Sequence, residues 1–122
     1  MHPQTIDSEA VAPLTPAVFH VLLALSEGEK HGWAIMQDAE RLSDGVVRMG
    51  PGTLYGSLRR LLEAGLIEES GERPDPELDD ERRRYYRLTD AGADALAAET
   101  ARLARLVSAA RKRRVLQPRA AT

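Results

Sequence analysis

The residues best suited to chemistry are two adjacent arginines and the small or polar residues that precede them. A guanidinium stays charged at physiological pH and presents a planar fork of donors, which fits phosphate oxygens and the O6 and N7 atoms of guanine. At 100° per residue, the same segment places its leucines on the opposite side of a helix. We therefore expect the other side, with Thr53, Gly56, Arg59 and Arg60, and its borders, with Tyr55 and Ser57, to contact a nucleic acid.

The expected roles differ along this face. Arg60 fits the edge of a guanine, and Gly56 permits a close approach of the backbone. Thr53, Tyr55 and Ser57 fit phosphates beside the helix N-terminus, where free backbone N–H groups favour anions. The alternative is that this face is solvated and contacts nothing.

Two further basic runs fit phosphate. Arg82, Arg83 and Arg84 stand directly before an alternating aromatic segment, where they suit contact with a nucleic-acid backbone. Their alternative role is to neutralise the acidic residues of 72–81. The run from 111 to 119 contains no acid and is either a second contact or a solvated helix end whose cations complement the helix dipole.

Residues that often carry catalysis are absent or unsuitably spaced. The chain has no cysteine, which excludes a disulfide, a thiolate metal site and a cysteine nucleophile, and fits a reducing environment. His2, His20 and His31 lack metal-ligand spacing, so packing or capping is expected for the last two. Neighbouring acids stand on a strand end and in a loop, which hold no fixed carboxylate separation. We predict no enzyme activity, no cofactor and no metal.

Helical spacing of apolar residues predicts three short helices. Thr15 and Pro16 start the first, which Gly28 ends, and the second runs from about 32 to 42. The third, 52–64, is capped by Gly65. Its apolar stripe consists of Leu54, Leu58, Leu61 and Leu62.

Two strands and a long helix complete the expected order. The segments 66–69 and 84–88 are predicted to pair as antiparallel strands around a polar loop, with Tyr86 and Leu88 on one face and Tyr85 and Arg87 on the other. A final helix is expected over about 90–114, since proline is absent there. Its apolar residues recur at the spacing of helices packed lengthwise on one another. A small domain cannot bury this stripe alone, so we predict a homodimer through Leu96, Leu103, Leu106, Val107 and Ala110.

The predicted fold is mainly α with a small β-hairpin wing, which is the order of a winged helix-turn-helix with an appended dimerisation helix. The 122 residues suffice for about one domain. We divide them into an N-terminal tail at 1–13, a winged helix-turn-helix domain at 14–88, a dimerisation helix at 89–114 and a tail at 115–122. Neither a secretion signal nor a membrane span is apparent, so the expected location is the cytoplasm.

Several short motifs resemble the PadR family of bacterial transcriptional regulators, in its subgroup with a single short C-terminal helix. They are His31-Gly32-Trp33-Ala-Ile35, Pro51-Gly52-Thr53-Leu54-Tyr55, Glu63-Ala-Gly65-Leu66-Ile67 and Arg84-Tyr85-Tyr86-Arg87-Leu88-Thr89-Asp-Ala-Gly92. The resemblance covers about residues 14–100. Two departures are Trp33, where the family usually has tyrosine, and a longer, more acidic wing, which weakens a role for the wing tip on DNA.

The resemblance implies a homodimeric repressor that binds a palindromic operator in double-stranded DNA. A small-molecule effector is left open; Trp33, Phe19 and Met36 are the only candidates to line its pocket, with core packing as their alternative role. The rival hypothesis is a winged-helix module that binds other proteins and never DNA. The net charge of −2 and the acidic wing motivate that rival.

Overall fold

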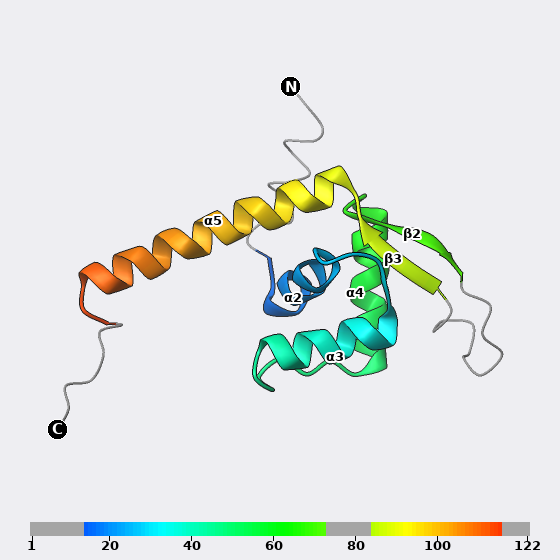
Figure 1. Ribbon diagram of the computed structural model, residues 1–122, viewed down its shortest axis with the longest axis horizontal. Coiled ribbons are helices and arrows are strands. Elements are labelled where there is room, and N and C mark those ends of the chain that lie inside the picture. The colour runs from blue at the N-terminus through cyan, green and yellow to red at the C-terminus, as the bar shows by residue number, and fades with distance from the viewer. Residues whose placement is uncertain (1–13, 73–83, 116–122) are drawn as a thin grey trace.

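The computed structural model describes residues 14–72 and 84–115, and these fold into short helices, a small sheet and one long helix (Figure 1). The elements in chain order are α2 (Pro16–Leu25), β1 (Lys30–His31), α3 (Gly32–Leu42), α4 (Pro51–Glu63), β2 (Ile67–Glu72), β3 (Arg84–Leu88) and α5 (Asp90–Lys112).

Three helices begin at a side chain that accepts a hydrogen bond from the first turn. Thr15 Oγ1 accepts from the Val18 N–H at 3.1 Å, as the sequence predicted. His31 Nδ1 accepts from the Ala34 N–H at 3.1 Å, which confirms a capping role for this histidine. At the start of α5, Thr89 Oγ1 accepts from the Gly92 N–H at 3.1 Å. Each cap satisfies a backbone donor that would otherwise lack a helical partner.

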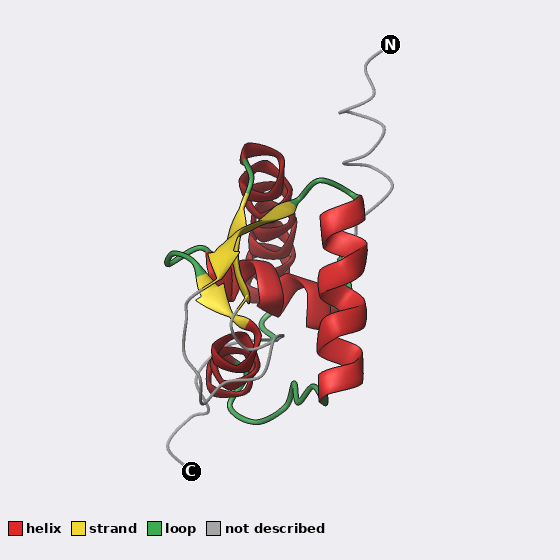
Figure 2. Ribbon diagram, turned by 90° about the vertical axis from the view of Figure 1, so that its right-hand side faces the viewer, coloured by secondary structure: helices red, strands yellow, loops and turns green. Residues whose placement is uncertain are grey.

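The core is formed where α2, α3 and α4 meet the sheet and the first half of α5. The leucine stripe of α4 faces inward as predicted: Leu54, Leu58 and Leu61 are buried, and Leu62 packs at the margin. Figure 2 shows the sheet lying along one side of the helices. Burial of these side chains stabilises the fold by about 1.5–3 kcal/mol each.

Gly65 ends α4 in the way the sequence predicted. Its φ of +76° lies in the left-handed region, which glycine adopts without steric cost. The Leu66 N–H then donates to the Leu61 carbonyl at 3.0 Å, closing the helix in a Schellman motif. The chain turns at once into β2.

The sheet differs from the predicted two-stranded hairpin because it has a third strand. The order is β1–β3–β2, all antiparallel, with Lys30 opposite Tyr86 and His31 opposite Tyr85. A two-residue strand is too short to show an alternating pattern, so β1 could not be predicted from the residues alone. β2 is also longer than predicted and continues through an irregularity between Glu69 and Gly71.

Within β3 the predicted alternation is confirmed. Tyr86 is buried and Leu88 is half-buried, whereas Arg87 is exposed and its Nε donates to Glu68 Oε2 at 2.7 Å. The polar loop expected between the two strands, at 73–83, lies outside the described residues, and so does the expected tail at 1–13.

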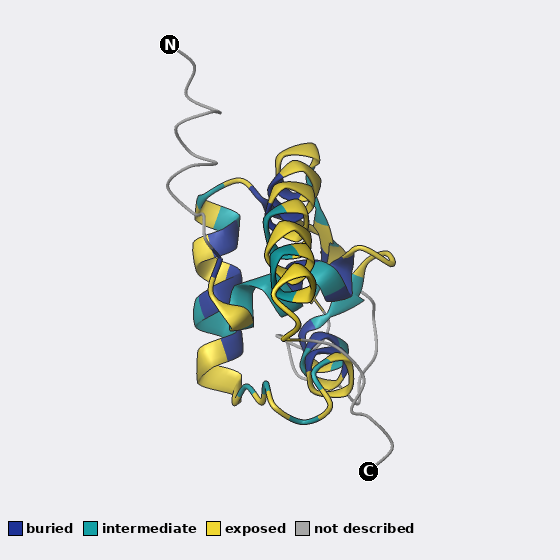
Figure 3. Ribbon diagram, turned by 90° about the vertical axis from the view of Figure 1, so that its left-hand side faces the viewer, coloured by how far each residue is buried: buried dark blue, intermediate teal, exposed yellow. Residues whose placement is uncertain are grey.

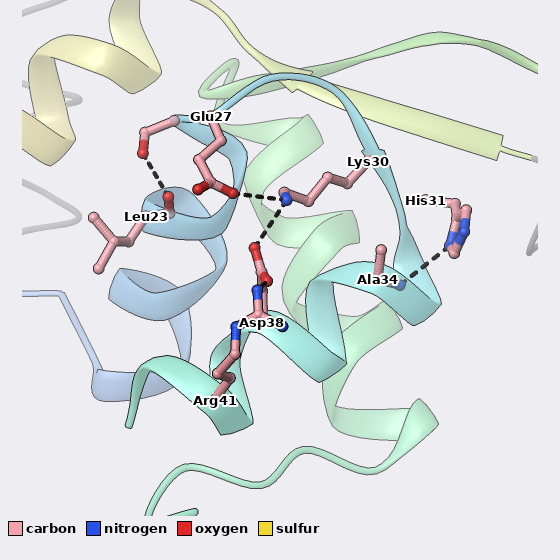
Figure 4. Close-up of polar contacts among 8 residues, drawn as sticks. Leu23, Glu27, Lys30, His31, Ala34, Asp38 and Arg41 are labelled. Carbon is pink, nitrogen blue, oxygen red and sulfur yellow. Dashed lines mark hydrogen bonds and ion pairs between the residues drawn. The ribbon is translucent and has the colours of Figure 1, made fainter. Parts of the chain in front are cut away.

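A charged cluster ties the turn after α2 to α3. Lys30 Nζ lies 2.9 Å from Asp38 Oδ2 and 3.0 Å from Glu27 Oε1, and Arg41 pairs with the other oxygen of Asp38 (Figure 4). Asp38 is buried, so two cations compensate the cost of removing its carboxylate from water. The hydrogen bond from Lys30 holds the pKa of Glu27 below its usual range.

The first half of α5 packs on the domain, and its second half extends away from it (Figure 1). Figure 3 shows the extended half coloured mostly as exposed. The helix ends two residues before the predicted boundary. Among the described helices, none combines the length and hydropathy required to cross a bilayer.

Candidate nucleic-acid interface

The outward side of α4 is polar and accessible. Thr53, Arg59 and Arg60 are exposed, and Gly56 is half-buried with open space around the position of a Cβ atom. Packing therefore does not require glycine at position 56, and its lack of a side chain lets another backbone come close. Tyr55 is half-buried as well, so five of the six predicted α4 residues are at least partly accessible.

The N-terminus of α4 is open to an anion. Gly50 is the N-cap, and no side chain accepts from the first turn. Gly50, Pro51 and Gly52 are all exposed. The uncapped backbone N–H groups at this end carry partial positive charge, which favours a phosphate.

A groove separates α4 from the wing strands and contains side chains from both. Arg59 and Tyr55 come from α4, Arg84 and Tyr86 from β3, and Glu69 from β2. The fold thereby places two predicted arginines, one from the helix and one from the strand, along the same groove. Sequence reasoning missed Glu69, which becomes visible only through its pairing opposite Tyr86 in the sheet.

Ser57 is a correction to the sequence prediction. Its side chain is only 1% exposed, and its Oγ accepts from Arg60 Nη2 at 3.5 Å. One turn of helix separates it from Leu54 and Leu61, so position 57 falls on the inner edge of the leucine stripe. The Ser57 hydroxyl thus contacts the Arg60 guanidinium and is not presented to the surface.

Tyr55 is half-buried, at the border between the apolar stripe of α4 and its outward side. A Cβ atom built on Gly32 would stand 2.7 Å from the Tyr55 hydroxyl oxygen, so the ring end rests against the first residue of α3. Position 32 therefore has little room for a larger residue, because Tyr55 of α4 packs against it. Tyr55 links the N-termini of α3 and α4 while remaining partly accessible.

The other basic residues divide between the described and undescribed parts. Arg84 is exposed at the start of β3, whereas Arg82 and Arg83 lie outside the described residues, together with the acidic run. Arg111, Lys112, Arg113 and Arg114 are exposed at the far end of α5, away from α4 (Figure 1). His, Cys, Asp and Glu residues of 14–72 and 84–115 form no group of three suited to a metal.

The helices α2, α3 and α4, followed by a small antiparallel sheet, define a winged helix-turn-helix protein. The sequence model of the "Transcriptional regulator PadR-like family" matches residues 21–98. The chain belongs to this family, which confirms the predicted resemblance. The family consists of transcriptional regulators, in agreement with the prediction of a protein that is not an enzyme.

Individual relatives support the same fold. RosR from H. salinarum is 31% identical, with a TM-score of 0.59 over 74% of each chain. PadR from Bacillus subtilis, solved in complex with operator DNA, is 20% identical, with a TM-score of 0.59 over 90% of this chain and 53% of that one. An uncharacterised 37.1 kDa protein of transposon Tn4556 from Streptomyces fradiae is 40% identical over 89 residues. These residues are 70% of this chain and 22% of that protein.

Proposed function

We propose that this protein is a homodimeric transcriptional repressor that places α4 in the major groove of a palindromic operator. The observation that carries the proposal is the shared groove, in which Arg59 of α4 and Arg84 of the wing line one accessible surface. The solved complex of Bacillus subtilis PadR with operator DNA supports the same use of a similar fold. Arg60 reads a guanine, Thr53 and the α4 N-terminus contact phosphate, and Gly56 admits the DNA backbone.

The division of the chain follows from this proposal. Residues 14–88 bind DNA, and the helix that follows Thr89 joins two copies. Leu106 is 55% exposed and Val107 41% exposed, with Leu103 and Ala110 half-buried on the same side. Leu96 is buried in the core of its own chain, so it anchors α5 to the domain. Two antiparallel or crossing α5 helices would set the α4 helices about one DNA turn apart.

An effector, where one acts, would shift the distance or angle between the two domains through α5. Such a shift requires that the effector bind one arrangement more tightly than the other. Phe19 and Met36 are packed against the core, which favours the packing role for Phe19. Met36 and Trp33 also reach a surface hollow, considered below.

Fluorescence anisotropy with duplexes tiled across the protein's own upstream region tests the proposal, with scrambled duplexes as controls. Arg60→Ala is expected to weaken specific binding by about 1–3 kcal/mol, because it removes a bidentate base contact. Arg105→Ala is the matched control, since Arg105 is an exposed arginine on α5. Its operator affinity should equal that of the unmodified protein.

The opposite results have clear meanings. One result is that no genomic duplex binds more tightly than scrambled duplexes at any salt concentration. That result would favour the rival hypothesis, a module that binds other proteins. Equal losses from Arg60→Ala and Arg105→Ala would contradict a specific role for α4 and indicate that any exposed arginine contributes equally to binding.

A further inference from the structure

A surface hollow of about 790 Å³ lies on α3, away from the groove that faces the wing. The connection 43–50 runs beneath α3 and leads to the start of α4 (Figure 1). Residues of α3, of this connection and of the first position of α4 line the hollow. Its volume is in the range of sites that hold small organic molecules.

The apolar wall of the hollow is formed by Trp33, Met36, Met49 and Pro51. Trp33 is 44% exposed, so part of its indole is accessible at the surface of the protein. An indole offers a flat surface for a second ring or for a cation, and methionine side chains adapt to ligands of varied shape. This wall favours a flat aromatic ligand.

The polar groups of the hollow favour positive charge. Glu40 and Asp44 contribute carboxylates, and Gln37 contributes an amide. The Arg41 guanidinium also borders the hollow, but it pairs with the buried carboxylate of Asp38 (Figure 4). Arg48 stands 4.0 Å from Glu40 and is largely exposed, so it neutralises Glu40 only weakly.

We propose that this hollow binds a small aromatic cation, whose ring lies against Trp33 while its charge faces Glu40 and Asp44. Because Pro51 lines the hollow and is the first residue of α4, an occupant contacts the start of this helix, and we expect it to change operator affinity. This consequence rests on the proposed regulatory function. The binding step itself does not.

Binding is measured first on the DNA-free protein. The cationic 4-aminoquinaldine, the neutral quinaldine and the anionic quinaldate share one ring system and differ in charge. Calorimetry should give saturable binding at one site per chain, tightest for the cation. Trp33 is the only tryptophan, so its corrected emission should change along the same isotherm. Absence of saturable binding, or equal affinity for all three compounds, would overturn the proposal.

Substitutions locate the site. Glu40→Gln and Asp44→Asn should each weaken 4-aminoquinaldine about two- to fivefold, as expected for a partly exposed ion pair. Asparagine suits position 44, whose φ is +55°, because it tolerates the left-handed region. Asp94→Asn removes an exposed carboxylate of α5 and should leave the affinity unchanged. Equal effects of all three substitutions would place the cation elsewhere.

The coupling is tested separately on the operator. 4-Aminoquinaldine should change operator affinity in the unmodified protein by more than in Glu40→Gln at the same concentration. Ligand binding without any change in operator affinity would overturn the coupling. Failure to bind any operator would instead contradict the proposed function, while the DNA-free measurements still decide the site.

Discussion

At the scale of single residues, the tightest packing constraint lies at the start of α5. A Cβ atom on Gly92 would stand 1.9 Å from the Leu66 carbonyl oxygen, which belongs to the backbone and cannot rotate away. The Thr89 N–H donates to the same carbonyl at 3.1 Å, and Thr89 Oγ1 donates to the Gly65 carbonyl at 2.6 Å. The Thr-x-x-Gly motif therefore joins α5 to the end of α4.

Gly92→Ala should destabilise the fold by about 1–3 kcal/mol, the usual cost of forcing an extra methyl into a packed site. Urea denaturation followed by circular dichroism measures the loss. Gly56→Ala is the control, because open space surrounds position 56; it should be neutral or slightly stabilising, since alanine is the better helix former. A larger loss at position 56 than at 92 would contradict this packing argument.

Glu99 is the second constrained residue, since its side chain is only 3% exposed. Arg102 donates to it through Nε at 2.8 Å and Nη2 at 2.6 Å. The hydrogen bond from Arg102 lowers the pKa of Glu99 below its usual range, with a smaller contribution from the Leu14 backbone. The pair holds the chain before α2 against α5.

A lowered pKa in the folded state means that the Glu99 carboxylate stabilises the protein fully above its usual pKa. This stabilisation is lost as the pH falls through the lowered value. Urea midpoints measured from neutral to acidic pH should therefore fall less steeply for Glu99→Gln than for the unmodified protein. Identical pH profiles would show that Glu99 does not contribute to acid sensitivity.

At the scale of elements, α4 and β3 act as one surface because the sheet holds Arg84 beside the groove that contains Arg59. Neither element alone presents both charges. β1 pairs with the other edge of β3, and the His31 ring contacts the Tyr85 ring edge-on at 5.3 Å between centroids. The position of the wing strand is thus fixed from the start of α3 as well as from β2.

Each phosphate contact contributes about 0.9 to the slope of log affinity against log salt concentration. Because the proposed dimer carries each arginine twice, Arg59→Ala with Arg84→Ala should therefore remove four contacts and reduce the slope for operator DNA by roughly 3.6 if both arginines contact phosphate. Anisotropy titrations over a salt series measure it. Arg105→Ala again serves as control, and an unchanged slope in the double variant would place both arginines off the DNA.

At the scale of the whole molecule, the proposed dimer depends on the extended half of α5. It exposes Leu106 and Val107 beyond the domain. A second copy of α5 packed along this surface would bury the stripe, and two recognition helices would then bind one operator.

Leu106→Glu with Val107→Glu should convert the proposed dimer to a monomer, because two carboxylates would be buried at the interface without partners. Both residues are exposed in the single chain, so the fold itself should persist. Light scattering coupled to size exclusion gives the mass. Ser108→Glu, whose position faces away from the stripe at 100° per residue, should remain dimeric. A monomeric unmodified protein would refute the prediction.

The sequence by itself determined the local features of this protein. The cap at Thr15, the leucine stripe of α4, the glycine at position 65 and the alternation of β3 were all predicted, and the structure confirms them. Each depends on residues within one or two turns of one another, where helical and strand periodicity fix which side chains share a face.

Only the tertiary structure decided the features that join distant segments. It added β1, buried Ser57, set Tyr55 against Gly32, and placed Arg59, Arg84 and Glu69 along one groove. These outcomes depend on how helices cross and in which register strands pair, and that geometry is settled by packing of the whole core rather than by neighbours along the chain.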